Sequence, residues 1–400
     1  MSGNERARFA PSALDLHYIC TMNENSHDVG PLMRLVKERI VVLDGAMGTL
    51  VRDGGLTAAD AHRAYIEAGA DIITSNSIMA NRLLCGDAVT RLASNAIGAA
   101  VEAARACPRR VWVAGGMGPA GVRRHGIGEV ADAYLEQAAL LVQGGADFIL
   151  AETMVDIDSA MAAVDAVQQL DADVRVAVSF SLRADSRLHD GTPLDTAVRM
   201  AAHRGAMAVG INCCDTGTPL LRAAMIASGA TGLPLMVYPS LSQCGGHSLA
   251  EAMAPLARQG LLNVAGGCCG TTPADVAALR AVCAKAQPRR VVVKTLAQRR
   301  AEIDWGKFFE LMGLGGYGSI AAVQGCDCRR AVWLARQANA GGGAEAMQAY
   351  KCAQRVLDSL ERLGSRACRH RLDDMAMHAA SANEAKMLGC LAAVLWPDGR

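Results

Sequence analysis

Eight short apolar segments recur along this chain, and a longer stretch with helical periodicity follows each of them. The segments are rich in strand-forming residues and lie at 40–44, 71–76, 111–115, 147–152, 174–179, 208–213, 234–238 and 263–267. The stretches between them are rich in Ala and space their apolar residues as amphipathic helices do. Strands that alternate with helices over about 250 residues match a (β/α)8 TIM barrel, although a doubly wound open sheet shows the same alternation.

The residues that end these segments distinguish the two architectures. In barrel enzymes the functional site is assembled at the C-terminal ends of the strands. Nearly every segment here ends in a polar, aromatic or cysteine residue: Asp44, Asn76, Glu152, Ser179, Cys213, Tyr238 and Cys268. We therefore predict a TIM barrel with its site at this rim. Thr57 and Thr272 are expected to cap helices, and the Gly-Ala-Asp runs that begin at Gly69 and Gly145 are expected to end helices just before a strand.

The chain divides into three predicted parts. Residues 1–36 are expected to form an irregular N-terminal extension, residues 37–288 the barrel, and residues 289–400 a mainly helical C-terminal region of unknown role. In the last part, apolar residues are spaced to share one helix face at Met347, Tyr350, Leu357, Leu360 and Leu363, and residues 375–395 show a similar pattern. We expect these helices to pack on the barrel or on a second subunit, as in a homo-oligomer.

Composition excludes several classes of protein. The formal net charge of +1 indicates neither a nucleic-acid nor a membrane-surface partner. The N-terminus lacks the apolar core of a secretory signal, and no apolar run approaches the ~18 residues of a membrane-spanning helix. Fourteen cysteines in 400 residues do not indicate the disulfide framework of a small secreted domain. We therefore expect a cytoplasmic protein with reduced thiols.

Two adjacent cysteines, Cys268 and Cys269, follow the last apolar segment and point to metal chemistry. Adjacent side chains of an extended strand point to opposite faces, so both reach one metal only where the backbone departs from regular geometry. The flanking glycines permit such a departure. Together with Cys213 at another strand end, three thiolates match a catalytic zinc site with an open fourth position. The simpler interpretation is that these are small buried apolar residues, as most single free cysteines are.

Several segments together resemble the homocysteine S-methyltransferase family, which includes the homocysteine-binding barrel of cobalamin-dependent methionine synthase. The matching runs lie at residues 43–49 (Leu-Asp-Gly-Ala-Met-Gly-Thr), 64–71, 80–82, 94–100, 152–153, 212–213 and 266–273 (Gly-Gly-Cys-Cys-Gly-Thr-Thr-Pro). In order, they cover the whole predicted barrel. Three places at the rim depart from the family pattern: Ser240 stands where the family often has Asn, and residues 74–78 and 115–119 differ from the usual second and third strand ends.

The resemblance implies a zinc ion and its ligands. The family's three zinc-binding cysteines fall here on Cys213, Cys268 and Cys269. Cys214 competes with Cys213, which we prefer because it directly follows Asn212, as the metal-binding Cys does in the family.

The resemblance also implies where homocysteine binds. Asp44 and Glu152 are expected to bind its ammonium group, with a turn or cap role as the alternative for Asp44. The other expected substrate contacts are Asn76 and the run Gly45, Ala46, Met47, Gly48 and Thr49, whose backbone amides suit a carboxylate.

The implied reaction is methyl transfer to homocysteine, giving methionine. A thiol with a pKa of about 8.5 is mostly protonated at neutral pH, and coordination to zinc removes that proton. The three cysteine thiolates make the metal electron-rich, so the substrate sulfur stays nucleophilic.

The methyl donor is less constrained. A betaine-like donor needs an aromatic cage, and aromatic residues make up only 4% of the chain. We expect a methylcorrinoid or methylfolate system supplied in trans, with methylcobalamin on a separate protein, because Asp60-Ala-His62 lacks the Gly of the family's cobalamin motif. S-methylmethionine or S-adenosylmethionine is the alternative donor. Another thiol acceptor, and a non-catalytic scaffold that binds zinc and homocysteine, also remain open.

Overall fold

Eight parallel strands form the centre of the computed structural model, which describes residues 29–52, 54–120, 125–170, 174–241, 246–292, 303, 305–312, 343–362, 372, 375–377, 379 and 381–395. The strands are β1 (Val41–Val42), β2 (Ile72–Thr74), β3 (Trp112–Met117), β4 (Phe148–Met154), β5 (Val176–Phe180), β6 (Ala208–Asn212), β7 (Leu235–Tyr238) and β8 (Val264–Ala265). Each overlaps one of the eight predicted segments.

The sheet closes on itself. Its order is β1-β8-β7-β6-β5-β4-β3-β2, and β1 pairs with β8 through Val41 and Val264. A parallel bridge between Leu43 and Ile72 joins the two remaining edges, where the Asp44 N–H donates to the Ile72 carbonyl over 3.0 Å. The predicted TIM barrel is thereby confirmed, and the open sheet is excluded.

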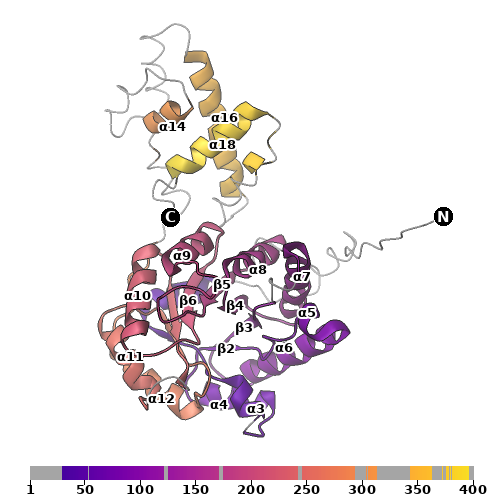
Figure 1. The fold of residues 1–400 in the computed structure, drawn as a ribbon, viewed down its shortest axis with the longest axis vertical. Helices are drawn as coiled ribbons and strands as arrows, with labels where there is room; N and C mark the ends of the chain where they lie inside the picture. The colour runs from indigo at the N-terminus through magenta and orange to yellow at the C-terminus, as the bar shows by residue number, and fades with distance from the viewer. Residues whose placement is uncertain are drawn as a thin grey trace, which may run out of the picture.

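Helices surround the strands, as Figure 1 shows for the view along the barrel. They are α3 (Met47–Arg52), α4 (Ala58–Glu67), α5 (Arg82–Cys85), η1 (Gly86–Ala88), α6 (Val89–Arg105), α7 (Ile127–Gln143), α8 (Ile157–Leu170), α9 (Leu194–His203), α10 (Thr218–Ala230), α11 (Leu249–Arg258) and α12 (Pro273–Cys283). Thr57 and Thr272 cap α4 and α12 as predicted, each accepting a backbone N–H with its side chain. Gly69 and Gly145 have φ angles near +100°, the left-handed turn that leads from a helix into the next strand.

Two layers of apolar side chains fill the fold. One lies between strands and helices, and the other fills the barrel interior with residues such as Leu43, Phe148 and Tyr238. An additional helix, α2 (Gly30–Glu38), adds Leu32 and Val36 to the interior layer. The sequence predicted an irregular extension up to residue 36, but its last residues, from Gly30 onward, belong to helix α2. Residues 1–28 lie outside the described part.

The C-terminal helices have a hydrophobic core of their own. They are α14 (Trp305–Leu311), α16 (Gly343–Arg362) and α18 (Ala382–Leu395), drawn in orange and yellow in Figure 1. Phe308, Leu357 and Leu391 are completely buried between them, and the Trp305 and Tyr350 rings meet edge to face at 4.9 Å. The shared face predicted for Tyr350 and Leu357 is confirmed. Leu363 and the side chains of Met347 and Leu360 lie outside the described residues.

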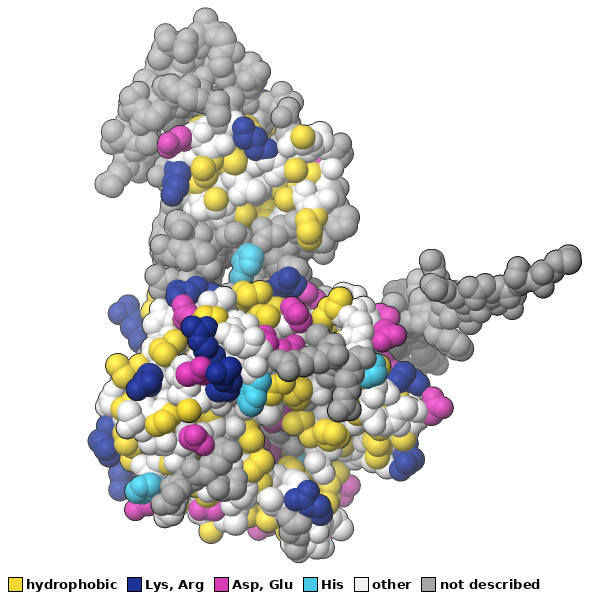
Figure 2. All heavy atoms as spheres, viewed as in Figure 1, with side chains coloured by type: hydrophobic (Ala, Val, Ile, Leu, Met, Phe, Trp, Pro, Cys, Tyr) yellow, Lys and Arg dark blue, Asp and Glu magenta, His cyan; other side chains and the backbone are white. Residues whose placement is uncertain are grey.

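The surface carries a mixed charge pattern. On the face shown in Figure 2, basic and acidic side chains are interspersed over the barrel, in keeping with the formal net charge of +1. Among the helices that the structure describes, none is long and apolar enough to cross a membrane.

Candidate metal centre and substrate site

Three cysteines converge at the C-terminal rim of the barrel. The Sγ atoms of Cys213, Cys268 and Cys269 all lie within 4.8 Å of one another, and the Cys213 and Cys269 sulfurs are 3.7 Å apart. Zn–S bonds of about 2.3 Å in a tetrahedral site place two sulfurs about 3.8 Å from each other. The cluster therefore fits a zinc ion with three thiolate ligands.

Cys213 enters the cluster through an unusual backbone conformation. It directly follows β6 and has a φ of 47°, in the left-handed region that non-glycine residues seldom adopt. Its N–H donates to the Tyr238 carbonyl over 3.3 Å, and its carbonyl accepts from the Ser181 hydroxyl over 3.2 Å. These two bonds fix the turn that directs the side chain toward β8.

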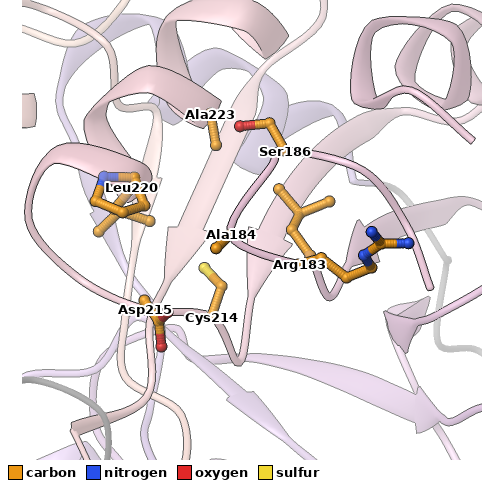
Figure 3. A pocket seen from close by; sticks show the side chains of 9 residues that line it. Arg183, Ala184, Ser186, Cys214, Asp215, Leu220 and Ala223 are labelled. Atoms are coloured by element: carbon orange, nitrogen blue, oxygen red, sulfur yellow. The ribbon is translucent and has the colours of Figure 1, made fainter. Parts of the chain in front are cut away.

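Cys214 takes no part in the cluster. Its buried side chain lines a small pocket between the loops that follow β5 and β6, together with Arg183, Asp215 and Leu220 (Figure 3). Because the Cys213 turn separates the two neighbouring side chains, the geometry favours Cys213 over Cys214 as the third ligand.

The Cys268-Cys269 pair sits in a tight loop. The Cys268 N–H donates to the Pro239 carbonyl over 2.9 Å, and the Cys269 carbonyl accepts from the Leu241 N–H over 2.8 Å. Behind them, the Thr271 hydroxyl donates to the Cys268 carbonyl over 2.7 Å. A Cβ atom on Gly267 would lie only 2.5 Å from the Thr271 side chain, so only glycine fits there. This loop brings two adjacent sulfurs to one point.

The three thiols share one ionisation. Hydrogen bonds from Cys213 and Cys268 to Cys269 hold the pKa of the Cys269 thiol well below its usual range. Hydrogen bonds with Cys213 and Cys269, together with burial, raise the pKa of Cys268. Without metal, the arrangement thus favours one thiolate held by two thiols.

Two carboxyl groups accompany the cysteines. Asp44 is buried at the end of β1, and its Oδ2 accepts the Thr74 N–H over 2.8 Å. Burial raises the pKa of Asp44 well above its ordinary value. Burial and the nearby Cys269 raise the pKa of Glu152, on β4, to about 7. Thr74 places the two carboxyl groups on the same side of the rim: its N–H donates to Asp44 Oδ2, and its Cγ2 and Glu152 Oε1 lie 3.0 and 2.9 Å from the same Cβ position on Gly116.

Glycine leaves room for the Glu152 carboxyl group. A Cβ atom on Gly116, in the neighbouring strand β3, would lie 2.9 Å from Glu152 Oε1. It would also meet the Ser75 carbonyl oxygen at 3.0 Å. The absence of a side chain at position 116 therefore allows Glu152 to occupy its place at the rim.

The run from Gly45 to Thr49 leads from β1 into the short helix α3, which starts at Met47. The Tyr65 hydroxyl bonds the carbonyls of Ala46 and Thr271, at 3.1 and 3.0 Å. The Ala46 N–H donates to Thr271 Oγ1 over 3.0 Å, so this one of the five predicted amides already has an acceptor within the protein. Residues 45–49 and the cysteine loop are thus joined through Tyr65 and Thr271, to which the sequence analysis assigned no role of their own.

The loop after β2 has a mainly structural role. Asn76 is exposed, whereas its neighbours Ser75 and Ser77 are buried and bind the Gly116 backbone over 3.1 and 2.7 Å. In the run 80–82, Asn81 caps α5 and donates to Gln137 over 3.1 Å, and the Arg82 side chain forms ion pairs with Glu136 and Asp87. That part of the family resemblance is explained by loop anchoring.

A buried amide lies next to the cluster, and the sequence analysis used it only to choose Cys213 as the ligand without assigning it a role. Asn212, at the end of β6, hydrogen-bonds Thr153, Ser179 and Cys268. Its position directly before Cys213 was the only available signal, because burial of its side chain depends on the closed barrel.

Comparison with known proteins fits this site. The sequence pattern of the homocysteine S-methyltransferase family matches residues 41–283, which include every strand and the three cysteines. The chain belongs to the homocysteine S-methyltransferase family.

Similar proteins are known from several bacteria. Methionine synthase from Mycobacterium leprae is 27% identical over 316 residues, which cover 67% of this chain and 26% of that protein. Methionine synthase from Mycobacterium tuberculosis is 27% identical over 318 residues. The chain spans about a quarter of the length of these curated relatives. The metallated form of the homocysteine methyltransferase MmuM from Escherichia coli superposes with a TM-score of 0.56 and 28% identity, covering 63% of this chain and 99% of that one.

Proposed function

We propose that this protein is a zinc-dependent methyltransferase that binds homocysteine as a thiolate and converts it to methionine. The observation that carries the proposal is the convergence of three thiol groups and two carboxyl groups at the barrel rim. The family and the metallated form of the Escherichia coli homocysteine methyltransferase support it.

The roles of the residues follow from their chemistry. Cys213, Cys268 and Cys269 would hold the zinc ion, which keeps the substrate sulfur deprotonated and nucleophilic at neutral pH. The carboxyl groups of Asp44, which is buried, and of Glu152, which is half-buried, would bind the substrate ammonium group. A cation between them favours their charged forms, offsetting the burial that raises both pKa values.

A methylcorrinoid or methylfolate system supplied by a separate protein is our proposed methyl source. Support comes from the methionine synthases, of which this chain matches about a quarter. The full-length match to MmuM favours a small donor such as S-methylmethionine or S-adenosylmethionine as the second candidate. A quaternary-ammonium donor has less support, because Tyr238, the aromatic residue at the β7 end, is buried in the barrel interior with its hydroxyl against Ser179.

The test is methyl transfer by the zinc-loaded protein. Methionine should form from homocysteine and free methylcobalamin, and Cys268→Ser should abolish both zinc retention and turnover. The matched control is Cys214→Ser, which removes a neighbouring buried thiol and should keep metal and activity. Turnover with S-methylmethionine or S-adenosylmethionine, but not with methylcobalamin, would identify a sulfonium compound as the methyl donor. A zinc-loaded protein that binds homocysteine but turns over none of these donors would favour the non-catalytic scaffold.

A further inference from the structure

The Asn212 side chain is completely buried at the end of β6, directly before Cys213. A carboxamide offers two N–H donors and two lone pairs on its oxygen. Oδ1 accepts from the Thr153 N–H over 3.1 Å and from the Ser179 hydroxyl over 3.0 Å. Nδ2 donates to Thr153 Oγ1 over 2.7 Å and to Cys268 Sγ over 3.9 Å. All four positions are used. A reversed amide would set its NH2 group against the Thr153 N–H, which would then keep only its longer bond of 3.4 Å to Ser179 Oγ.

The first partner of Asn212 is a strained residue. Thr153 has a φ of 59°, which is rare for a β-branched side chain. The β4–β5 ladder changes register between Ala151 and Met154, around the same residue. Such irregularities re-aim side chains next to functional sites, and they persist only where their surroundings hold them. Asn212 holds Thr153 by both its N–H and its hydroxyl, and thereby sets the direction of the preceding residue, Glu152.

The second partner is a metal-binding sulfur. Cys268 is the more buried member of the adjacent pair, and the Asn212 N–H approaches its Sγ from β6. A hydrogen bond to a metal-bound thiolate withdraws electron density from the sulfur and fixes its orientation. Groups that bind metal ligands in this way affect metal affinity as well as geometry.

We propose that Asn212 is a positioning residue that couples the metal-binding thiolates to the carboxylate that binds the substrate ammonium group. Its Oδ1 and Nδ2 together hold Thr153 in the β4 irregularity that aims Glu152, and Nδ2 also donates to the Cys268 sulfur. This inference rests on the proposed function. It adds to the site a residue, Asn212, that neither ligates the metal nor binds the substrate.

The test uses Co²⁺ in place of zinc, because the sulfur-to-Co²⁺ charge-transfer band reports the electron density on the thiolates. Asn212→Leu has nearly the same size and removes the N–H···S bond without adding charge. We expect its band to shift to longer wavelength, its Co²⁺ affinity to fall roughly 10–100-fold, and homocysteine to perturb the spectrum only at higher concentration. The matched control is Ser179→Ala, which removes one bond to the same amide but leaves both Nδ2 donations, and its band should stay at the wild-type position.

Equal loss of stability in Asn212→Leu and Ser179→Ala, with neither band shifted, would reduce Asn212 to a structural residue and overturn the proposal.

Thr153→Val provides a second test if Asn212→Leu does not fold. It removes only the Oγ1 anchor, and it should weaken homocysteine binding several-fold while the band stays in place; wild-type binding would overturn the link to Glu152. These spectra need no methyl donor. If no methionine forms, the spectra still decide whether Asn212 acts on the metal ligands. A wild-type protein that binds no Co²⁺ would overturn both proposals.

Discussion

Single residues at the rim decide which groups can approach one another. Gly116 is the clearest example, because the space that its missing side chain leaves is occupied by the Glu152 carboxyl group and the Ser75 carbonyl. The sequence pointed to Glu152 through its place at a strand end, but nothing in it linked positions 116 and 152. That link exists only because β3 and β4 are neighbours in the closed sheet.

Gly116→Ala should impair substrate binding. The new Cβ atom would lie within about 3 Å of Glu152 Oε1 and of a backbone oxygen that cannot yield easily. Displacing a binding group by about 1 Å can cost on the order of 100-fold, so we expect homocysteine KM to rise at least tenfold. Steady-state kinetics of the zinc-loaded enzyme measure this.

The matched control is Gly98→Ala in α6, where nothing lies within 4 Å of the added atom. Alanine is the better helix former by up to about 1 kcal/mol, so this variant should keep its KM and unfold at an equal or higher denaturant concentration. An unchanged KM in Gly116→Ala would show that Glu152 does not bind the substrate from its present position.

At the scale of elements, one carboxylate joins the strands and helices at the start of β2. Asp71 is buried, accepts the Val42 N–H from β1 over 3.0 Å, and forms ion pairs with Arg39 and Arg280 at 2.7 and 3.1 Å. Burial alone would raise the pKa of Asp71, but the hydrogen bond and charge of Arg39, the Val42 N–H and the charge of Arg280 leave it below its usual value. The Gly-Ala-Asp run therefore ends a helix and also anchors the next strand.

Asp71→Ala should destabilise the barrel by about 2 kcal/mol, because it leaves the buried Val42 N–H without its acceptor. The arginines are about two-fifths exposed and keep access to water, which limits the loss. Denaturant unfolding monitored by circular dichroism measures the change. Asp195→Ala breaks an exposed ion pair with Arg199 in α9 and should cost less than about 1 kcal/mol. Equal effects of the two substitutions would contradict the anchoring role.

At the scale of the whole molecule, stability should depend on pH through a buried histidine. Burial lowers the pKa of His62, in α4, to about 4, and neither ring nitrogen has a hydrogen-bond partner among the described residues. A histidine with a lower pKa in the folded state binds its proton more readily in the unfolded chain. Its protonation therefore favours unfolding as pH falls from about 6.5 toward 4.

Between pH 7.5 and pH 5, we expect this residue to reduce the free energy of unfolding by about 2 kcal/mol. The raised pKa of Glu152 acts in the opposite direction over the same range, so the His62 contribution is the difference between the wild-type protein and His62→Leu. Denaturant unfolding at both pH values, in metal-free protein so that zinc release does not contribute, measures the loss. His62→Leu should be markedly less sensitive to acid across this range, with little change in stability at pH 7.5. A variant that loses as much stability as the wild-type protein would show that other groups carry the pH dependence.

The sequence by itself determined the fold class and predicted the cysteine cluster, although it left Cys214 open as an alternative to Cys213. Strand and helix periodicities are local properties, so eight alternating units could be recognised without knowing their packing. The rim residues could also be recognised, because every parallel strand of a barrel presents its C-terminal end to the same side. For that reason Cys213, Cys268 and Cys269 were predicted to meet although more than fifty positions separate the first from the other two.

Only the tertiary structure decided how the groups at the rim are oriented. The turn at Cys213 that excludes Cys214, the space that Gly116 leaves for Glu152, and the use of the Ala46 N–H by Thr271 depend on contacts between distant segments. The same holds for Asn212, whose amide acts on both Thr153 and Cys268. Local sequence decides which backbone conformations are low in energy. The direction of a buried polar side chain follows instead from the partners that the closed barrel brings within hydrogen-bonding distance.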